Sequence, residues 1–454
     1  MKRNLIPALL LILCLCSCGA NPSGPSEPET AENSAEPVAV SGTYDIYVTG
    51  YDWGSAVDKA VIHFDGVLDS VGKDDFTVTE TKTVTDYEQD NTPVVERTFD
   101  REVVDAYLTD ANGARTDAPS DTVTLELYAS PSDGSPINYD PVPGLNTWCD
   151  PYYLTIEVKP AEEEGMLSNG KEVASVTVDT AVSHRFTSVD DIAIASFTSS
   201  DNVTYPYAHY EPEGGSKTLV VWLHGGGEGG TENTSPQITM LANEAVNLMR
   251  ADFQSKVGGA NVLIPQCPTL WMDMTGDAVL GSVWEINTGT SFYTPSLKEL
   301  IDAYKEETGS EKVILTGCSN GGFMSLLMAM TYPGEYDGIV PICEALKDEY
   351  ITDAQLEAVK DLPMYFVYSE DDDTVVPELY EIPTLNRLSA MGASNVHIST
   401  TEHVTDTSGQ YKDADGNPYQ YAGHFSWVYF HNDETACDEH GETAWDFIAE
   451  IVKA

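Results

Sequence analysis

The sequence has very few cationic residues. Lysine and arginine together number 22 in a chain of 454 residues, against 74 aspartates and glutamates, and the formal net charge is −52. A field of this sign repels phosphate backbones and anionic lipids, so we expect no nucleic-acid partner. Hydrophobic residues make up 41% of the chain, with 24 tyrosines and 7 tryptophans. That content excludes a disordered acidic chain and predicts a folded, soluble protein.

Cysteine is also scarce, and its spacing is not that of a metal site. The eight cysteines include no Cys-x-x-Cys pair, so we expect no structural zinc and no metal ligands. Five cysteines follow residue 18, namely Cys149, Cys267, Cys318, Cys343 and Cys437. Because five is an odd number, at least one thiol stays unpaired, and the sequence does not predict which.

The first 18 residues have the pattern of a secretory signal. Lys2 and Arg3 precede an apolar run over residues 5–15 that is too short to span a membrane. The run ends in Leu15-Cys16-Ser17-Cys18, which resembles a bacterial lipobox and implies that Cys18 becomes the lipid-modified first residue; an ordinary secretory signal is the alternative. Residues 19–42 have the composition of a flexible linker. We expect a protein outside the cytoplasm, held at the cell membrane only by this lipid.

Residues 43–190 show the rhythm of an antiparallel β-sandwich. Short alternating segments lie between clusters of Gly, Pro, Asp and Asn, and five of them are predicted strands, over residues 44–48, 60–64, 103–108, 123–127 and 154–158. The segment 48–54, which contains Trp53, resembles the immunoglobulin-like domain found in front of some bacterial esterases. This domain carries no catalytic pattern, and we expect it to serve as a spacer or as a wall of the active site.

Residues 191–454 alternate short apolar runs with amphipathic segments. The apolar runs predict buried parallel strands over residues 219–223, 262–264, 313–315, 339–342 and 364–368. Helical periodicity begins at Thr294 and ends at Gly309, and it recurs over residues 323–330 and 445–452. The alternation predicts a three-layer α/β domain, whose site lies beyond the carboxyl ends of the strands.

A candidate nucleophile lies between one of these strands and the next helix. The motif is Gly317-Cys318-Ser319-Asn320-Gly321. A strand–turn–helix of this kind is a nucleophile elbow, in which small residues allow the tight turn and the helix N-terminus faces a developing oxyanion. The sequence therefore predicts Ser319 as a catalytic nucleophile.

A serine nucleophile needs a base and an acid, which in this architecture follow it in the order acid, then histidine. The loop after the strand over residues 364–368 contains three consecutive aspartates, and its D-x-x-V-P ending favours Asp373, with Asp371 and Asp372 as its alternatives. The base is predicted to be His424, which precedes the last helix, with His403 as the second choice.

The oxyanion hole is expected to use backbone amides. One is that of Asn320, after the nucleophile, and the other comes from Gly226 or Gly227 in the glycine-rich run after the strand over residues 219–223. We expect His224 to support that run. Trp427 and Trp271 are proposed to line a substrate pocket, and core packing is the alternative for each.

Taken together, residues 224–230, 264–268, 317–322, 373–377 and 424–427 resemble the bacterial esterase and predicted-peptidase branch of the α/β-hydrolase superfamily, related to feruloyl esterases and polyhydroxybutyrate depolymerase-like proteins. The resemblance implies a carboxylic-ester hydrolase acting on a small or polymer-linked ester, with no cofactor. Two alternatives stay open: a serine peptidase of the prolyl-oligopeptidase kind, and a surface lipoprotein that binds without catalysis.

Overall fold

The computed structural model describes residues 37–159, 166–230, 235–277, 287–436 and 441–454. The predicted signal, Cys18 and most of the linker over residues 19–42 lie outside the described residues, as does Cys437. Residues Pro37–Ala454 form one compact unit. In the described part of the chain no helix has the length and apolarity needed to cross a membrane.

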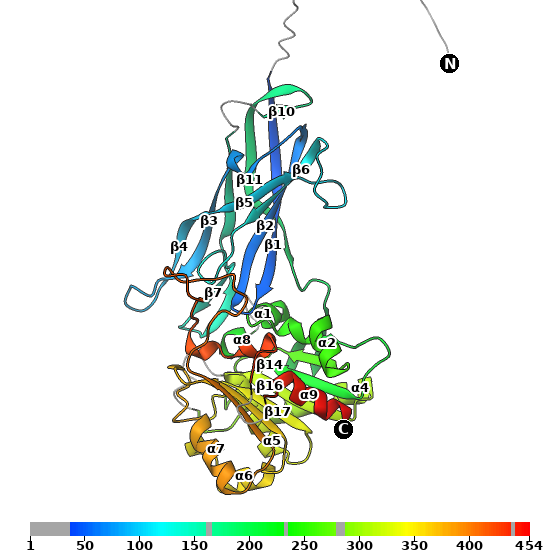
Figure 1. Cartoon of the computed structure of the whole chain (residues 1–454), viewed down its shortest axis with the longest axis vertical. Helices are drawn as coiled ribbons and strands as arrows, with labels where there is room; N and C mark the ends of the chain where they lie inside the picture. The colour runs from blue at the N-terminus through cyan, green and yellow to red at the C-terminus, as the bar shows by residue number, and fades with distance from the viewer. Residues whose placement is uncertain (1–36, 160–165, 231–234, 278–286, 437–440) are drawn as a thin grey trace, which may run out of the picture. The chain divides into compact units, whose positions relative to one another are not determined.

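The N-terminal domain is built from mainly antiparallel sheets, as the sequence predicted (Figure 1). Its six-stranded sheet has the order β10-β11-β1-β2-β6-β5, with β10 at Leu167–Ser168, β11 at Lys171–Thr187, β1 at Val38–Tyr51, β2 at Gly54–Leu68, β6 at Ser120–Leu127 and β5 at Val103–Leu108. The pair β1 and β11 is parallel. A three-stranded sheet has the order β4-β3-β9, with β4 at Val94–Arg101, β3 at Phe76–Thr85 and β9 at Tyr152–Val158. A hairpin joins β7, at Ile137–Asp140, to β8, at Leu145–Trp148.

One fully buried tyrosine ties the two larger sheets together. The hydroxyl of Tyr44, on β1, accepts a hydrogen bond of 2.7 Å from the amide of Leu154 on β9, and lies 3.0 Å from the carbonyl oxygen of Thr180, which it can donate to. Inward-facing apolar residues of both sheets pack around it, which is the arrangement of a β-sandwich.

The C-terminal domain is built on an eight-stranded sheet of order β12-β13-β15-β14-β16-β17-β18-β19. The strands are β12 at Ala193–Thr198, β13 at Thr204–Tyr210, β15 at Asn261–Pro265, β14 at Thr218–Leu223, β16 at Lys312–Cys318, β17 at Gly338–Ile342, β18 at Met364–Ser369 and β19 at Val396–Thr401. From β15 to β19 all neighbours are parallel, while β12 and β13 form an antiparallel edge. The five buried strands predicted from the apolar runs are all present.

Helices cover both faces of this sheet, and this explains why its strands are apolar on both sides. On one face Val220 and Trp222 pack with residues of three helices, α2 at Ala251–Val257, α8 at Trp427–His431 and α9 at Ala444–Lys453. On the other face Leu219, Val221 and Leu223 pack with residues of α4 at Thr294–Thr308, α5 at Asn320–Thr331, α6 at Asp353–Val359 and α7 at Glu381–Ala390. A short further helix, α1, spans Pro236–Leu241. The first of these apolar clusters continues without a break into the core of the N-terminal domain.

Candidate active site

Ser319 lies in the sharp turn between β16 and α5. Its backbone has φ 55° and ψ −117°, a strained conformation for a residue with a side chain. The turn closes only because its flanking residues are glycines: a Cβ on Gly317 would lie 2.6 Å from the carbonyl oxygen of Leu223, and one on Gly321 would collide with the same oxygen. The predicted elbow is therefore present, and Ser319 stands at the carboxyl edge of the sheet.

His424 is paired with Asp372. The Nδ1 atom of His424, in the short turn after the long loop that follows β19, lies 2.8 Å from Oδ2 of Asp372. The side chain of Asp372 is fully buried, and its Oδ1 accepts hydrogen bonds of 2.9 Å from the amides of Thr374 and Val375. Both oxygens of this carboxylate are thus used, one to fix the turn and one to orient the imidazole.

The structure does not support the prediction of Asp373: the carboxylate that pairs with His424 is that of Asp372, one residue earlier. Asp373 is exposed to solvent, because the turn that Asp372 caps with its own carboxylate directs the next side chain outward. Asp371, the first of the three aspartates, lies 2.7 Å from Nδ1 of His403 instead. His403, the alternative base, is thereby held at the surface, and the hydrogen bond to Asp371 raises its pKa.

A cavity of about 500 Å³ contains both Ser319 and His424. The C-terminal domain also contributes the glycine-rich loop over residues 225–228, Phe425 and Trp427. The N-terminal domain supplies residues that sequence reasoning did not assign to the site, namely Trp53, Gly54, Ser55, Ser135, Ile137, Tyr139 and Asn146. Concave, largely apolar cavities of this size are typical of small-molecule sites.

The two predicted pocket tryptophans have different places. Trp427 lines the cavity, lies edge-on to His424 with ring centroids 5.8 Å apart, and donates a hydrogen bond of 3.1 Å to the carbonyl oxygen of Asp52. Trp271 does not line it: the side chain is fully buried, next to Tyr205 and His224. Its assignment to the pocket is therefore wrong, because a buried aromatic of the core and one of a pocket have the same sequence signal.

The side chain of His224 supports the glycine-rich loop through hydrogen bonds. The Nε2 atom of His224 accepts a hydrogen bond of 2.9 Å from the amide of Cys267, so Nδ1 carries the proton and donates to the carbonyl oxygen of Gly225 at 2.7 Å. Burial lowers the pKa of His224 to about 4, which keeps the ring neutral. His224 thus supports the loop, as the sequence indicated, while Gly226 and Gly227 face the cavity.

Asn320, the first residue of α5, follows the nucleophile directly. Its side chain is buried and its Oδ1 accepts a hydrogen bond of 3.0 Å from the amide of Met272. This bond fixes the start of the helix beside Ser319, where the positive end of the helix dipole lies, but Asn320 itself is not among the residues that line the cavity.

The described cysteines are buried free thiols, and one of them, Cys318, lines the cavity. The four described cysteines, Cys149, Cys267, Cys318 and Cys343, are unpaired and buried. A ligand atom of Cys343, one of Asp372 and one of His424 lie within 4.8 Å of one another. Burial raises the pKa of the Cys343 thiol well above its usual value, and the other two members of this group, Asp372 and His424, are already bonded to each other.

Two carboxyl groups near the elbow helix, those of Glu344 and Glu381, are also deeply buried. Burial raises the pKa of Glu344 to about 8 and that of Glu381 well above its usual value. The amide of Leu346 donates a hydrogen bond of 2.8 Å to Glu344, and Gly322 of the elbow helix packs against its backbone. The folded protein therefore keeps a proton on Glu344 through neutral pH.

Two family models match the chain. The one described as the esterase Ig-like N-terminal domain matches residues 43–187, and the one described as phospholipase/carboxylesterase matches residues 209–409. No curated protein matches. The sandwich and the hydrolase-type domain predicted from the sequence are both confirmed.

Several solved structures resemble this chain. One titled as a thermostable esterase is 20% identical, with a TM-score of 0.62, over 87% of this chain and 96% of its own. A ferulic acid esterase is 10% identical, with a TM-score of 0.39, over 57% of this chain and 98% of its own. A Pyrococcus horikoshii acylaminoacyl peptidase is 13% identical, with a TM-score of 0.35, over 57% of this chain and 44% of its own. The first of these structures shares the fold of the two domains together.

Proposed function

We propose that this chain, a carboxylic-ester hydrolase of the α/β-hydrolase superfamily with an esterase immunoglobulin-like domain, cleaves its substrates with Ser319, His424 and Asp372 as a catalytic triad. The observation that carries the proposal is the strained elbow serine on the same cavity as a buried His424–Asp372 pair. Serine is a weak nucleophile at neutral pH and needs this kind of activation.

Each residue then has one task. Because Nδ1 of His424 donates to Asp372, Nε2 is left to take the proton of the Ser319 hydroxyl as Oγ attacks the ester carbonyl. The amides of Asn320 and of Gly226 or Gly227 stabilise the oxyanion. His424 returns the proton to the leaving alcohol. In the second half of the reaction His424 takes a proton from water, which attacks the acyl-enzyme, and then returns it to Oγ of Ser319 as the acid leaves.

Hydrolysis of a substrate panel tests this function. The panel contains p-nitrophenyl esters from acetate to decanoate, methyl ferulate and a peptide anilide. We expect the wild-type protein to hydrolyse esters, Ser319→Ala to be inactive, and Ser325→Ala to stay active. Ser325 is a suitable control because it is a buried serine of the same helix whose hydroxyl donates only to a carbonyl oxygen of that helix. Faster cleavage of the anilide than of a matched ester would indicate a peptidase, and no turnover of any substrate would favour a binding protein.

We also propose that the chain is exported and anchored by a lipid on Cys18. The support is the charged start, the short apolar run and the lipobox-like end of the first 18 residues. Expression in a bacterial host fed labelled palmitate should give a labelled, membrane-associated protein. Cys18→Ser should abolish the label and Cys16→Ser should keep it; label on Cys18→Ser would contradict the proposal.

A further inference from the structure

Asn146 of the immunoglobulin-like domain contacts the loop that carries the proposed oxyanion amides. It lies on β8, opposite Tyr139 of β7. Its Nδ2 donates a hydrogen bond of 2.8 Å to Oε1 of Glu228. The same side chain occupies the space beside Gly227, where an added Cβ would overlap the Asn146 amide. Asn146 therefore restrains two consecutive residues of the loop.

The side chain of Glu228 is almost completely buried, which is unusual for a glutamate. It is 3% exposed, and burial raises its pKa to about 7, while the hydrogen bond from Asn146 favours the ionised form. Burial raises the pKa of two neighbouring groups, Cys318 and Tyr139, and the charge of Glu228 raises the pKa of each further. A buried carboxylate that loses its donor must move or take up a proton, and either change alters the contact that holds the loop.

The catalytic domain holds the same residue from the opposite side. The Nε2 atom of Gln266 donates a hydrogen bond of 3.0 Å to the main-chain carbonyl oxygen of Glu228. The backbone of Glu228 is thus fixed by its own domain and its carboxylate by the other domain. The position of Gly226 and Gly227, directly before it in the chain, depends on both contacts.

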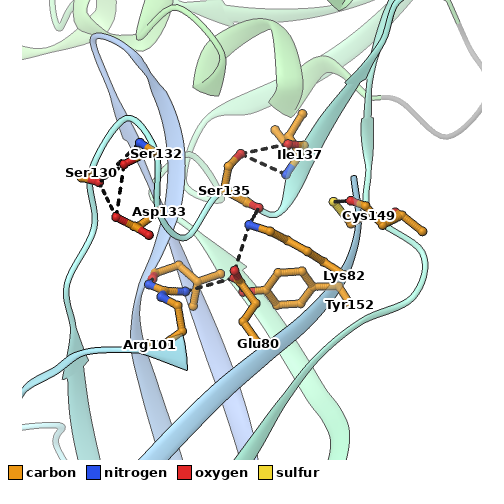
Figure 2. Close-up of polar contacts among 12 residues, drawn as sticks. Glu80, Lys82, Arg101, Ser130, Ser132, Asp133, Ser135, Ile137, Cys149 and Tyr152 are labelled. Carbon is orange, nitrogen blue, oxygen red and sulfur yellow. Dashed lines mark hydrogen bonds and ion pairs between the residues drawn. The ribbon is translucent and has the colours of Figure 1, made fainter. Parts of the chain in front are cut away.

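The segment that leads into the Asn146 hairpin is anchored by a buried cluster of charges (Figure 2). Glu80 is 1% exposed and forms ion pairs with Lys82 at 2.8 Å and Arg101 at 3.0 Å, and it accepts a hydrogen bond from the hydroxyl of Tyr152. Lys82 also donates a hydrogen bond of 2.7 Å to the carbonyl oxygen of Ser135, two residues before β7. Figure 2 shows the ammonium group of Lys82 between Glu80 and Ser135. The segment directly before the β7–β8 hairpin is therefore fixed to this buried cluster.

From these contacts we infer that Asn146 is a positioning residue for ester hydrolysis, which orients the Gly226 and Gly227 amides through Gly227 and Glu228. The inference rests on the proposed function. In this arrangement the immunoglobulin-like domain completes the oxyanion hole of the catalytic domain. Asn146 is bonded to Glu228 and not to Ser319 or His424, so its effect should appear in the transition state, where the oxyanion develops, more than in substrate binding.

A second contact between the same two domains provides a matched control. The Nδ2 atom of Asn432 donates a hydrogen bond of 2.8 Å to Oδ2 of Asp52. Like the Asn146 contact, it joins a half-buried asparagine to a carboxylate, but Asn432 does not line the cavity. A loss of activity caused only by weaker attachment of the domains would be similar in Asn146→Ala and Asn432→Ala.

The experiment measures kcat and KM on the best p-nitrophenyl ester and the rate of inactivation by a p-nitrophenyl phosphonate, whose phosphoryl oxygen occupies the oxyanion hole. The variants are Asn146→Ala, Asn146→Asp, Glu228→Gln, the double variant Asn146→Asp/Glu228→Gln, and Asn432→Ala. The double variant exchanges the donor and acceptor of the 2.8 Å bond and so restores it. Thermal unfolding is followed for every variant.

We expect Asn146→Ala and Asn146→Asp to lower kcat and the phosphonate rate by about 10- to 100-fold with KM nearly unchanged, somewhat less than the loss of an oxyanion donor itself. The double variant should recover most of the activity of Asn146→Asp, and Asn432→Ala should stay within about twofold of wild type. The inference is overturned by an Asn146→Ala kcat within twofold of wild type, by an equal loss in Asn432→Ala, or by a folded double variant without recovery. Absence of ester hydrolysis in the wild type would instead refute the proposed function, and the inference with it.

Discussion

Replacing Asp372 by asparagine should remove most of the activity while leaving the fold intact. Asparagine has the same shape, and its Oδ1 can still accept the amides of Thr374 and Val375 that close the turn. The group facing His424 then becomes an NH₂ donor in place of Oδ2, which is 2.8 Å from Nδ1. His424 must accept this bond at Nδ1, so its proton moves to Nε2 and the ring can no longer take the proton of Ser319.

The size of the effect follows from this exchange of tautomers. Loss of the correct tautomer in a serine hydrolase triad lowers kcat by about 10⁴-fold. That factor corresponds to about 5 kcal/mol in the activation free energy. KM should change little, because the carboxylate of Asp372 is buried behind the imidazole and does not line the cavity.

Steady-state hydrolysis of a p-nitrophenyl ester by Asp372→Asn, with Asp373→Asn as the control, measures this effect. Asp373 is the exposed neighbour, so its replacement should leave kcat within about twofold. Thermal unfolding of both variants reports on the fold. A reduced kcat in Asp373→Asn together with nearly full activity in Asp372→Asn would refute the assignment of the acid.

Three further outcomes follow from the packing around the site. The free energy of unfolding of Glu344→Gln relative to wild type should be higher at pH 9 than at pH 4 by about 5 kcal/mol, because the carboxyl pKa rises from 4.5 to about 8 on folding. The wild-type protein loses this stability as the pH increases through that window, and urea unfolding of both proteins at both pH values measures the difference. Gly321→Ala should destabilise the fold by about 1–3 kcal/mol or more through the collision with Leu223, whereas Gly72→Ala, where a Cβ has space, should not; equal melting temperatures would contradict this. Trp427→Ala removes a ring from the cavity wall, so KM for esters should increase about tenfold, and an unchanged KM would remove Trp427 from the binding site.

Local sequence patterns were sufficient for the fold class, the elbow and the histidine. Ser319 lies in a motif whose small residues are required by a turn between two strongly apolar elements, and His424 precedes the last helix in the expected order. The loop of Gly226 and Gly227 directly follows a buried strand. In each case the chemistry and the element that positions it are neighbours in the chain.

The remaining parts of the site depend on contacts that the sequence does not encode locally. Asp371, Asp372 and Asp373 are chemically identical, and only the turn that Asp372 caps decides which carboxylate points inward. Trp271 is apolar and aromatic whether it lines a pocket or a core. Asn146 meets Glu228 across a separation of 82 residues, from a hairpin that the strand pattern did not predict.

Covalent trapping of the nucleophile is the most direct test of the central claim, that Ser319 carries out ester hydrolysis. The protein is treated with a p-nitrophenyl phosphonate, residual esterase activity is measured, and the modified residue is located by peptide mass spectrometry. We predict one phosphonyl group on the peptide that contains Ser319, loss of activity in proportion to labelling, and no labelling of Ser319→Ala. Esterase activity that persists after Ser319 is fully labelled, or that persists in Ser319→Ala, would contradict the claim.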